Sequence, residues 1–192
     1  MTAGLYIHIP FCEKRCGYCD FYTLAHRQST IPEYIQALKK EIRMYARYPE
    51  IQALEFDTIY FGGGTPSLLT VKQIREILDS AYTYLKISCH PEITLEVNPG
   101  TVDRTKLRGY RTLGVNRLSL GIQSFQPQEL QFLDRIHSAE EAIDCFYNAR
   151  AADFTNLGID LIFAIPGQKL QTWEKNLNQA ISLEPEHISA YN

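Results

Sequence analysis

The stretch Cys12-Glu-Lys-Arg-Cys16-Gly-Tyr-Cys19 places three cysteines within eight residues, directly after a strand-like run over residues 5–9. Thiolates this close together are typical ligands of a single soft metal centre. A structural zinc site is usually closed by four ligands, whereas a four-iron cluster takes one thiolate for each iron. Three cysteines would therefore leave one iron without a protein thiolate, and a small molecule can bind an open iron.

Two more cysteines, Cys89 and Cys145, lie far from this loop in the sequence. Cysteines of this kind are most often small buried apolar residues. We expect both to be buried in the core, although some iron–sulfur clusters do take a distant cysteine as their fourth ligand.

Length and composition indicate one globular domain, residues 1–192, in a chain that is 45% hydrophobic and 21% charged. The net charge of −3 gives no electrostatic reason to expect nucleic acid or an anionic membrane as a partner. The sequence has no apolar run that could span a bilayer, and its first residues lack the pattern of a signal peptide. These features predict a cytoplasmic protein, in which thiols stay reduced.

Strand-like runs alternate with helix-like segments along the whole chain. The predicted strands cover residues 5–9, 56–61, 93–97, 117–122, 157–163 and 187–191. Repeated strand–helix units predict an α/β fold with a parallel sheet and helices outside it. Because the chain stops in a strand pattern, we expect it to be part of a longer protein.

Helix boundaries are indicated by local signals. Thr30 with Glu33, and Thr70 with Gln73, have the spacing of capping boxes and predict two helix starts. Gly114 is expected to end a third helix in the left-handed conformation.

Polar residues fall near the carboxyl ends of the predicted strands. The cysteine loop follows the first strand, and the run Gly62-Gly63-Gly64-Thr65-Pro66 follows the second. Glu96 lies near the end of the third strand, Gln123 and Ser124 end the fourth, and Asp160 lies within the fifth. Ligand sites of parallel α/β proteins collect at this edge of the sheet, so these residues predict one shared site.

Each of these residues also has a structural interpretation. Glu96 could be solvated on an edge strand, Gln123 could simply satisfy backbone groups, and Arg135 is by default a surface residue. Asp160, flanked by apolar residues, requires a polar partner. His8 on the first strand is most often a hydrogen-bonded core histidine.

The glycine run has neither the ending of a P-loop nor the spacing of a dinucleotide fingerprint. Glycines at a strand end nevertheless allow close approach of the backbone. Their N–H and C=O groups could bind a compact polar ligand such as an amino-acid head group.

The spacing Cys12-x3-Cys16-x2-Cys19, with an aromatic residue at Tyr18, resembles that of the radical S-adenosylmethionine (SAM) enzymes. Four further stretches resemble the branch that contains oxygen-independent coproporphyrinogen III oxidase and its relatives, the heme chaperones. They are Tyr6-Ile-His-Ile-Pro-Phe-Cys12, Phe61-Gly-Gly-Gly-Thr-Pro66, Leu118-Ser-Leu-Gly-Ile-Gln123-Ser-Phe and Ile159-Asp-Leu-Ile.

This resemblance implies a partial (β/α)6 barrel in which Cys12, Cys16 and Cys19 hold a [4Fe–4S] cluster. SAM would bind the open iron, and one electron from the cluster, which a donor protein would reduce, would cleave the SAM C–S bond. The resemblance assigns the SAM pocket as follows: Gly63, Gly64 and Thr65 at the methionine part, Arg135 at its carboxylate, Glu96 and Gln123 at the ribose, and Tyr6, Tyr18 and Asp160 around them.

Phe21 departs from the pattern of the oxidase, which has a fourth cysteine two positions past the third. The phenylalanine resembles the heme chaperones, and we therefore expect a protein that binds heme and passes it to a recipient protein. The alternatives are oxidative decarboxylation of coproporphyrinogen III, in which propionates become vinyl groups, and a non-catalytic zinc-binding module.

Overall fold

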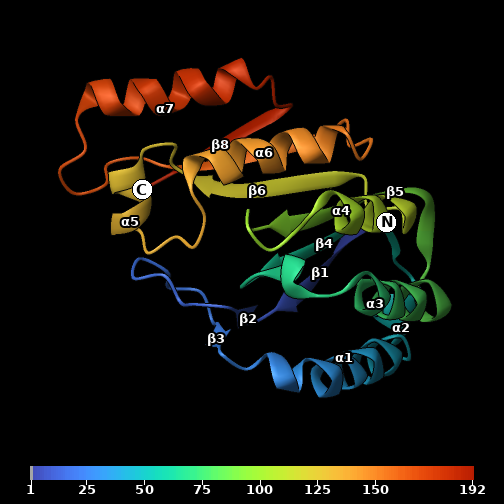
Figure 1. The fold of residues 1–192 in the computed structure, drawn as a ribbon. Coiled ribbons are helices and arrows are strands. Elements are labelled where there is room, and N and C mark those ends of the chain that lie inside the picture. The colour runs from blue at the N-terminus through green and yellow to red at the C-terminus, as the bar shows by residue number, and fades with distance from the viewer. Residues whose placement is uncertain (1) are drawn as a thin grey trace.

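The computed structural model describes residues 2–192, which form a six-stranded, all-parallel sheet in the order β1-β4-β5-β6-β7-β8. The strands are β1 (Thr2–Ile9), β4 (Glu55–Gly63), β5 (Ile87–Val97), β6 (Arg117–Gln123), β7 (Leu157–Ile162) and β8 (His187–Tyr191). In Figure 1 the arrowhead of β6 points toward α5 and the C-terminus, and the N-terminus lies on the opposite side. The predicted parallel α/β fold is confirmed.

Helices connect successive strands of this sheet. They are α1 (Ile31–Tyr45), α2 (Pro49–Gln52), α3 (Val71–Tyr84), α4 (Arg104–Thr112), α5 (Pro127–Phe132), α6 (Ala139–Arg150) and α7 (Leu170–Ser182), with short 3-10 turns at Gln28–Thr30 and Pro66–Leu68. Figure 1 shows α1 and α3 together below the strands, and α6 and α7 above them. Parallel strands need such crossovers, because the chain must return to the start of the sheet before each new strand.

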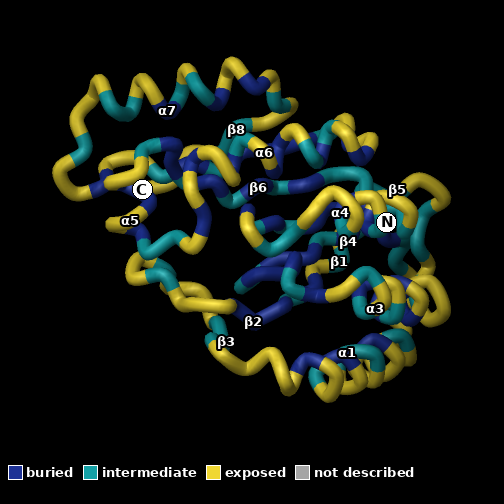
Figure 2. The backbone as a smooth tube through the Cα atoms, in the orientation of Figure 1, coloured by how far each residue is buried: buried dark blue, intermediate teal, exposed yellow. Residues whose placement is uncertain are grey.

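The two faces of the sheet differ in chemistry because side chains alternate along each strand. On β5, Ile93, Leu95 and Val97 are buried in the hydrophobic core, which also contains residues of α1, α3, α4 and α6. Thr94 and Glu96, which alternate with them, point to the opposite face of the sheet. Figure 2 shows the strands mostly buried, and the outer helix surfaces and the cysteine loop exposed. The sheet therefore presents a polar face and a polar carboxyl edge.

Several local predictions require correction. Thr30 does not close a capping box: its hydroxyl donates to the carbonyl of Arg27, and α1 starts from a 3-10 turn instead. Cys89 is exposed on the first half of β5, which extends six residues before the predicted start, whereas Cys145 is buried as expected. A second, two-stranded parallel sheet of β2 (Phe11–Cys12) and β3 (Leu24–Ala25) encloses the cysteine loop and was not predicted.

Other boundary signals are confirmed. The Thr70–Gln73 capping box forms with both of its hydrogen bonds. Gly114 follows α4 with φ +96°, in the left-handed region that glycine adopts without steric cost.

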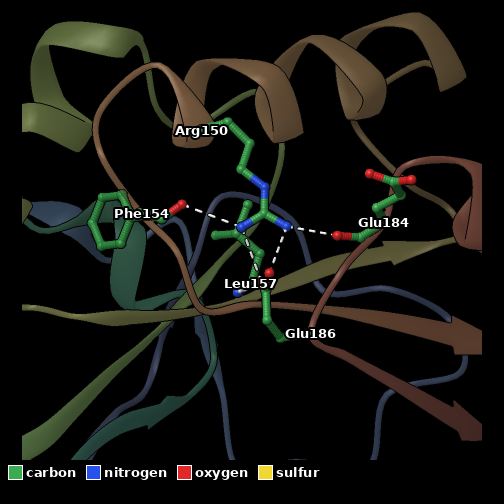
Figure 3. A network of polar contacts seen from close by, with 5 residues as sticks. All are labelled: Arg150, Phe154, Leu157, Glu184 and Glu186. Carbon is green, nitrogen blue, oxygen red and sulfur yellow. Dashed lines mark hydrogen bonds and ion pairs between the residues drawn. The ribbon is translucent and has the colours of Figure 1, made fainter.

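The amino-terminal end of β7 and β8 is held by an ionic network around Arg150 (Figure 3). The Arg150 guanidinium donates to both carboxylate oxygens of Glu186 at 2.9 Å and to the carbonyl of Glu184 at 2.7 Å. Glu186 also accepts the backbone N–H of Leu157 at 2.7 Å. The guanidinium lies 5.0 Å from the ring centroid of Phe146. One arginine on α6 thereby ties the start of β7 to the segment that enters β8.

We expect Arg150→Met to lower the free energy of unfolding by about 1–2 kcal/mol, because the charge-assisted hydrogen bonds from Arg150 to Glu186 and Glu184 are lost and solvent screens these groups only in part. Urea denaturation at neutral pH measures the change. Lys86→Met is the matched control, since the Lys86–Glu55 pair is more exposed, and it should leave the denaturation midpoint where it was. Equal effects of the two substitutions would contradict a special role for the Arg150 network.

Candidate functional site

A cavity of about 560 Å³ opens at the carboxyl edge of the sheet, where the sequence predicts a shared site. Eleven of the twelve predicted site residues line it: Cys12, Cys16, Tyr18, Cys19, Gly63, Gly64, Thr65, Glu96, Gln123, Arg135 and Asp160. The fold thus brings together residues that lie up to about 150 positions apart in the sequence, from five of the six strand ends.

Ser124, which follows β6, was expected at the shared site but is fully buried and does not line this cavity. Of the residues assigned to the SAM pocket, Tyr6 does not line it either. Its ring stacks on Tyr60, with centroids 6.0 Å apart, and its hydroxyl lies 3.1 Å from Nδ1 of His8. The other ring nitrogen of His8 lies 3.0 Å from the carbonyl of Tyr22. His8 is thus hydrogen bonded as predicted, although it is half-buried beside the glycine run and not in the core.

The three loop cysteines are free thiols in a polar, partly buried setting. The Thr65 hydroxyl lies 3.5 Å from Sγ of Cys12, and Nη1 of Arg135 lies 3.6 Å from Sγ of Cys16. Burial raises the pKa of the Cys12 thiol, and the hydrogen bond from Thr65 partly offsets this. Each donor would stabilise the sulfur that it contacts in the thiolate form, which is the form that binds metal.

Within residues 2–192, no three His, Cys, Asp or Glu side chains are arranged to hold a single metal ion. A mononuclear zinc centre therefore receives no support from the geometry. A four-iron cluster needs a different arrangement, because each thiolate binds its own iron and the sulfurs do not converge on one point.

The glycine run packs directly against the chain that enters the cysteine loop. The N–H of Gly64 donates to Ile9 at 2.8 Å, and that of Thr65 donates to Phe11 at 2.7 Å. A Cβ atom on Gly64 would lie 2.8 Å from the Phe11 carbonyl oxygen and 3.0 Å from Sγ of Cys12. Gly63 has φ +117°, which a side chain would not tolerate. The sequence Gly63-Gly64 is therefore required for two loops to lie in contact.

Glu96 lies on a central strand of the sheet, so the edge-strand interpretation is excluded. Its carboxylate accepts the hydroxyl of Tyr60 at 2.8 Å and the N–H of Gly63 at 3.1 Å. Burial raises the pKa of Glu96, and these two hydrogen bonds act in the opposite direction. Glu96 thus holds the glycine run in place and still faces the cavity.

Asp160 finds its polar partner on the neighbouring strand, as its apolar flanks require. The hydroxyl of Ser119 donates to its carboxylate at 2.8 Å, and Ser189 is its register partner on β8. Burial is the largest influence and raises the pKa of Asp160, although these hydroxyls lower it. No full positive charge neutralises this carboxylate at contact distance among its described hydrogen bonds.

Arg135 is a pocket residue and not a surface residue, which corrects the default interpretation. Its guanidinium donates to the side-chain oxygen of Asn98, to the carbonyl of Gly121 at 2.7 Å and to the hydroxyl of Tyr18 at 3.3 Å. Burial raises the pKa of Tyr18 to about 12, despite the nearby charge of Arg135. Arg135 therefore joins the cysteine loop to the ends of β5 and β6.

Several residues of the site were not predicted. Tyr60, Asn98 and Ser119 line the cavity. Asn98 directly follows β5, so the strand-end argument could have found it, and alternation along β4 and β6 could have found Tyr60 and Ser119. The ion pair between Lys14 Nζ and Asp134 Oδ1, 2.5 Å apart, joins residues 120 positions apart, and no local pattern indicates it.

A family model, that of the radical SAM superfamily, matches residues 6–180. The match includes the cysteine loop, the glycine run and the first five strands of the sheet. The chain belongs to the radical SAM superfamily.

Individual relatives fall in the coproporphyrinogen oxidase-like branch. The chain is 38% identical over 188 residues to "Heme chaperone HemW" of Bacillus subtilis (strain 168), covering 97% of this chain and 49% of the relative. It is 39% identical over 190 residues to "Heme chaperone HemW" of Escherichia coli (strain K12), covering 98% and 50%. The chain thus spans about half the length of these relatives.

A solved structure of the same branch has a very similar fold. Coproporphyrinogen III oxidase (HemN) from Escherichia coli, a radical SAM enzyme, superimposes with a TM-score of 0.90 at 31% sequence identity. The alignment covers 98% of this chain and 43% of that one. The α/β fold is therefore that of a partial radical SAM barrel.

Within residues 2–192, no helix has the length and apolar character needed to cross a membrane.

We expect Asp160→Asn to increase the free energy of unfolding at pH 8. The folded chain holds the Asp160 proton more tightly than the unfolded chain, so wild-type stability falls as pH rises from about 4, the ordinary aspartate value, through the raised pKa. The gain should shrink as the pH is lowered to 5, as measured by urea denaturation. Asp79→Asn, on the exposed side of α3, is the control. A less stable Asn variant at pH 8 would contradict the expectation.

Proposed function

We propose that this chain is the radical SAM core of a heme chaperone. Cys12, Cys16 and Cys19 hold a [4Fe–4S] cluster, the cavity binds SAM, and heme is the cargo of the full-length protein. The single observation that carries the proposal is the common cavity, in which the cysteine loop meets the glycine run and polar residues from three other strand ends. Membership of the superfamily implies the cluster and SAM.

The residues present fit the cluster. Three thiols lie on one loop, each able to bind one iron, and hydrogen-bond donors reach two of the sulfurs. Phe21 also lines the cavity but has no metal-binding atom, so it would not supply a ligand to the fourth iron of a bound cluster. Free cysteines in this number suit a reducing compartment, and we infer a cytoplasmic location.

The cavity also fits SAM. Gly63, Gly64 and Thr65 present backbone groups beside the cysteine loop, where they would contact the methionine part, and Arg135 would pair with its carboxylate. Glu96 and Gln123 face the cavity from β5 and β6, and their oxygen atoms would accept hydrogen bonds from ribose hydroxyls.

The remaining pocket residues complete the enclosure. Tyr18 and Asp160 both line the cavity, and Tyr6 would act through its stacking on Tyr60, another lining residue. When bound, the cluster and SAM together supply one-electron cleavage of the SAM C–S bond. The protein's own contribution is to orient SAM by hydrogen bonds and to exclude water from the buried end of the cavity.

Heme is proposed as cargo because relatives of 36–41% identity are named heme chaperones. Phe21 favours the same conclusion, because it replaces the fourth cysteine of the oxidase pattern with an exposed aromatic side chain. A recipient protein for the heme and an electron donor for the cluster complete the proposed set of partners. Coproporphyrinogen III oxidation is the second candidate, favoured by the close structural match to HemN.

We expect Cys12→Ala, Cys16→Ala and Cys19→Ala each to abolish cluster binding. Anaerobic reconstitution of the wild-type chain should incorporate about four irons per chain, and each variant should hold fewer than about one. Iron analysis and the charge-transfer absorption of the cluster provide the measurement. Cys89→Ala is the control, because this exposed thiol does not line the cavity and its loss should leave iron content unchanged. One bound zinc and no iron in the wild type would refute the proposal.

Heme transfer and porphyrinogen oxidation are separated in one experiment on the full-length protein. The protein is incubated anaerobically with coproporphyrinogen III, SAM and a reductant, and is separately titrated with heme. We expect stoichiometric heme binding and no protoporphyrinogen. Formation of protoporphyrinogen at a catalytic rate would instead identify the protein as an oxidase.

A further inference from the structure

His137 is a buried histidine close to the cavity that the proposed function does not use. It directly follows the Arg135-Ile136 pair on the connection between α5 and α6 and does not line the cavity. Its side chain is only 4% exposed. Burial lowers the pKa of His137 to about 4, assisted by the charge of Arg135, so the ring is neutral at physiological pH.

The His137 ring is bound to the end of β6. Its Nε2 lies 3.1 Å from the carbonyl oxygen of Ile122. A carbonyl can only accept, so Nε2 carries the proton and Nδ1 is left as an acceptor, with no partner within the described residues. The Cβ of His137 also lies 3.7 Å from the position that a Cβ on Gly100 would take, in the turn that follows β5. The histidine is therefore bonded to the end of β6 and lies beside the turn that follows β5.

The carbonyl that His137 binds precedes a strained residue. Gln123 has φ +70°, a left-handed conformation that is uncommon for residues other than glycine. The register between β6 and β7 is irregular between Leu120 and Gln123, so the strand leaves the regular ladder at this point. Strain of this kind persists only where surrounding contacts over-determine it, and it is frequent at functional sites. The hydrogen bond from His137 is such a contact.

The strained turn connects back to Arg135. The side-chain amide of Gln123 lies close to Gly121: a Cβ added to Gly121 would be 3.2 Å from Nε2 of Gln123. The carbonyl of Gly121 in turn accepts a hydrogen bond from the Arg135 guanidinium at 2.7 Å. His137, Ile122, Gln123, Gly121 and Arg135 therefore form a closed circuit of contacts. Three members of the circuit, Gly121, Gln123 and Arg135, line the cavity.

We infer that His137 is a positioning residue of the SAM pocket: by donating to the Ile122 carbonyl, it holds the left-handed turn at Gln123 and keeps Gln123 and Arg135 oriented toward SAM. This inference rests on the proposed function, because it concerns the same pocket. His137 itself does not touch the ligand and acts through two residues that do.

The test compares two neutral amide substitutions of different reach. The amide nitrogen of His137→Gln can replace Nε2 as donor to Ile122, whereas that of His137→Asn is one methylene too short. SAM affinity is measured by calorimetry on the anaerobically reconstituted full-length protein. We expect binding to weaken roughly tenfold in the Asn variant, as with other residues that orient ligating groups, and to be largely restored in the Gln variant.

Asn116→Ala is the matched control for a purely structural effect. Asn116 also bonds backbone groups, the N–H of Ile93 and the carbonyl of Pro91, but it does so at the start of β6 and the middle of β5, away from the carboxyl ends of these strands. It should lower the thermal midpoint without changing SAM affinity. If it weakens SAM binding as much as His137→Asn does, or if His137→Asn binds SAM normally, the inference is wrong.

Hydrogen exchange of the cluster-free chain gives a readout that needs no cofactor. His137→Asn should increase amide exchange over residues 119–124 and 133–137 together, and Asn116→Ala should not. Unchanged exchange in residues 119–124 of the Asn variant would overturn the inference even where the affinity is changed. If the wild-type protein with its cluster binds no SAM, the proposed function itself fails, and the inference fails with it.

Discussion

The close approach of Gly64 to the backbone that enters the cysteine loop is the contact on which the site depends. Without a side chain, Gly64 lies against the Phe11 carbonyl and Sγ of Cys12, and its N–H bonds to Ile9. The loop around the cysteines has little regular structure of its own beyond the β2–β3 pair. Its position relative to the sheet is therefore set by the glycine run, which Glu96 holds through the N–H of Gly63, together with the contacts that Arg135 makes to Cys16 and Tyr18.

The polar face of the sheet carries a cost in stability. Glu96 and Asp160 are carboxylates whose pKa values burial raises, and their nearest partners are hydroxyl and N–H groups without full charge. A core built for stability alone would place apolar residues there. Two partly buried carboxylates among hydroxyls are reasonable only where a ligand supplies further hydrogen-bond donors, which is consistent with a site for a polar molecule. At the opposite end of the strands, the carboxylate of Glu186 is instead paired with the charged guanidinium of Arg150 and also accepts the N–H of Leu157.

The strand-end argument predicted the site from sequence better than any single residue did. Glu96, Gln123 and Asp160 each had a plausible structural interpretation, but the carboxyl ends of parallel strands meet at one edge, and all three line one cavity. Arg135 could not be predicted in this way, because it follows a short helix and its contacts with Asn98 and Cys16 arise only on folding. Cys89 was assigned to the core by its residue type, but it lies on an exposed part of β5 that the periodicity did not identify.

The sequence by itself determined the parallel α/β order, the spacing of the three cysteines and the glycines that allow two loops to touch, because each follows from local periodicity or from the size of a side chain. Only the tertiary structure decided how Arg135, Asn98, Gly121 and His137 are arranged around the cavity, and which way the Gln123 turn bends. These contacts join residues from different strand ends. Their geometry depends on the register and packing of the sheet, which no local pattern contains.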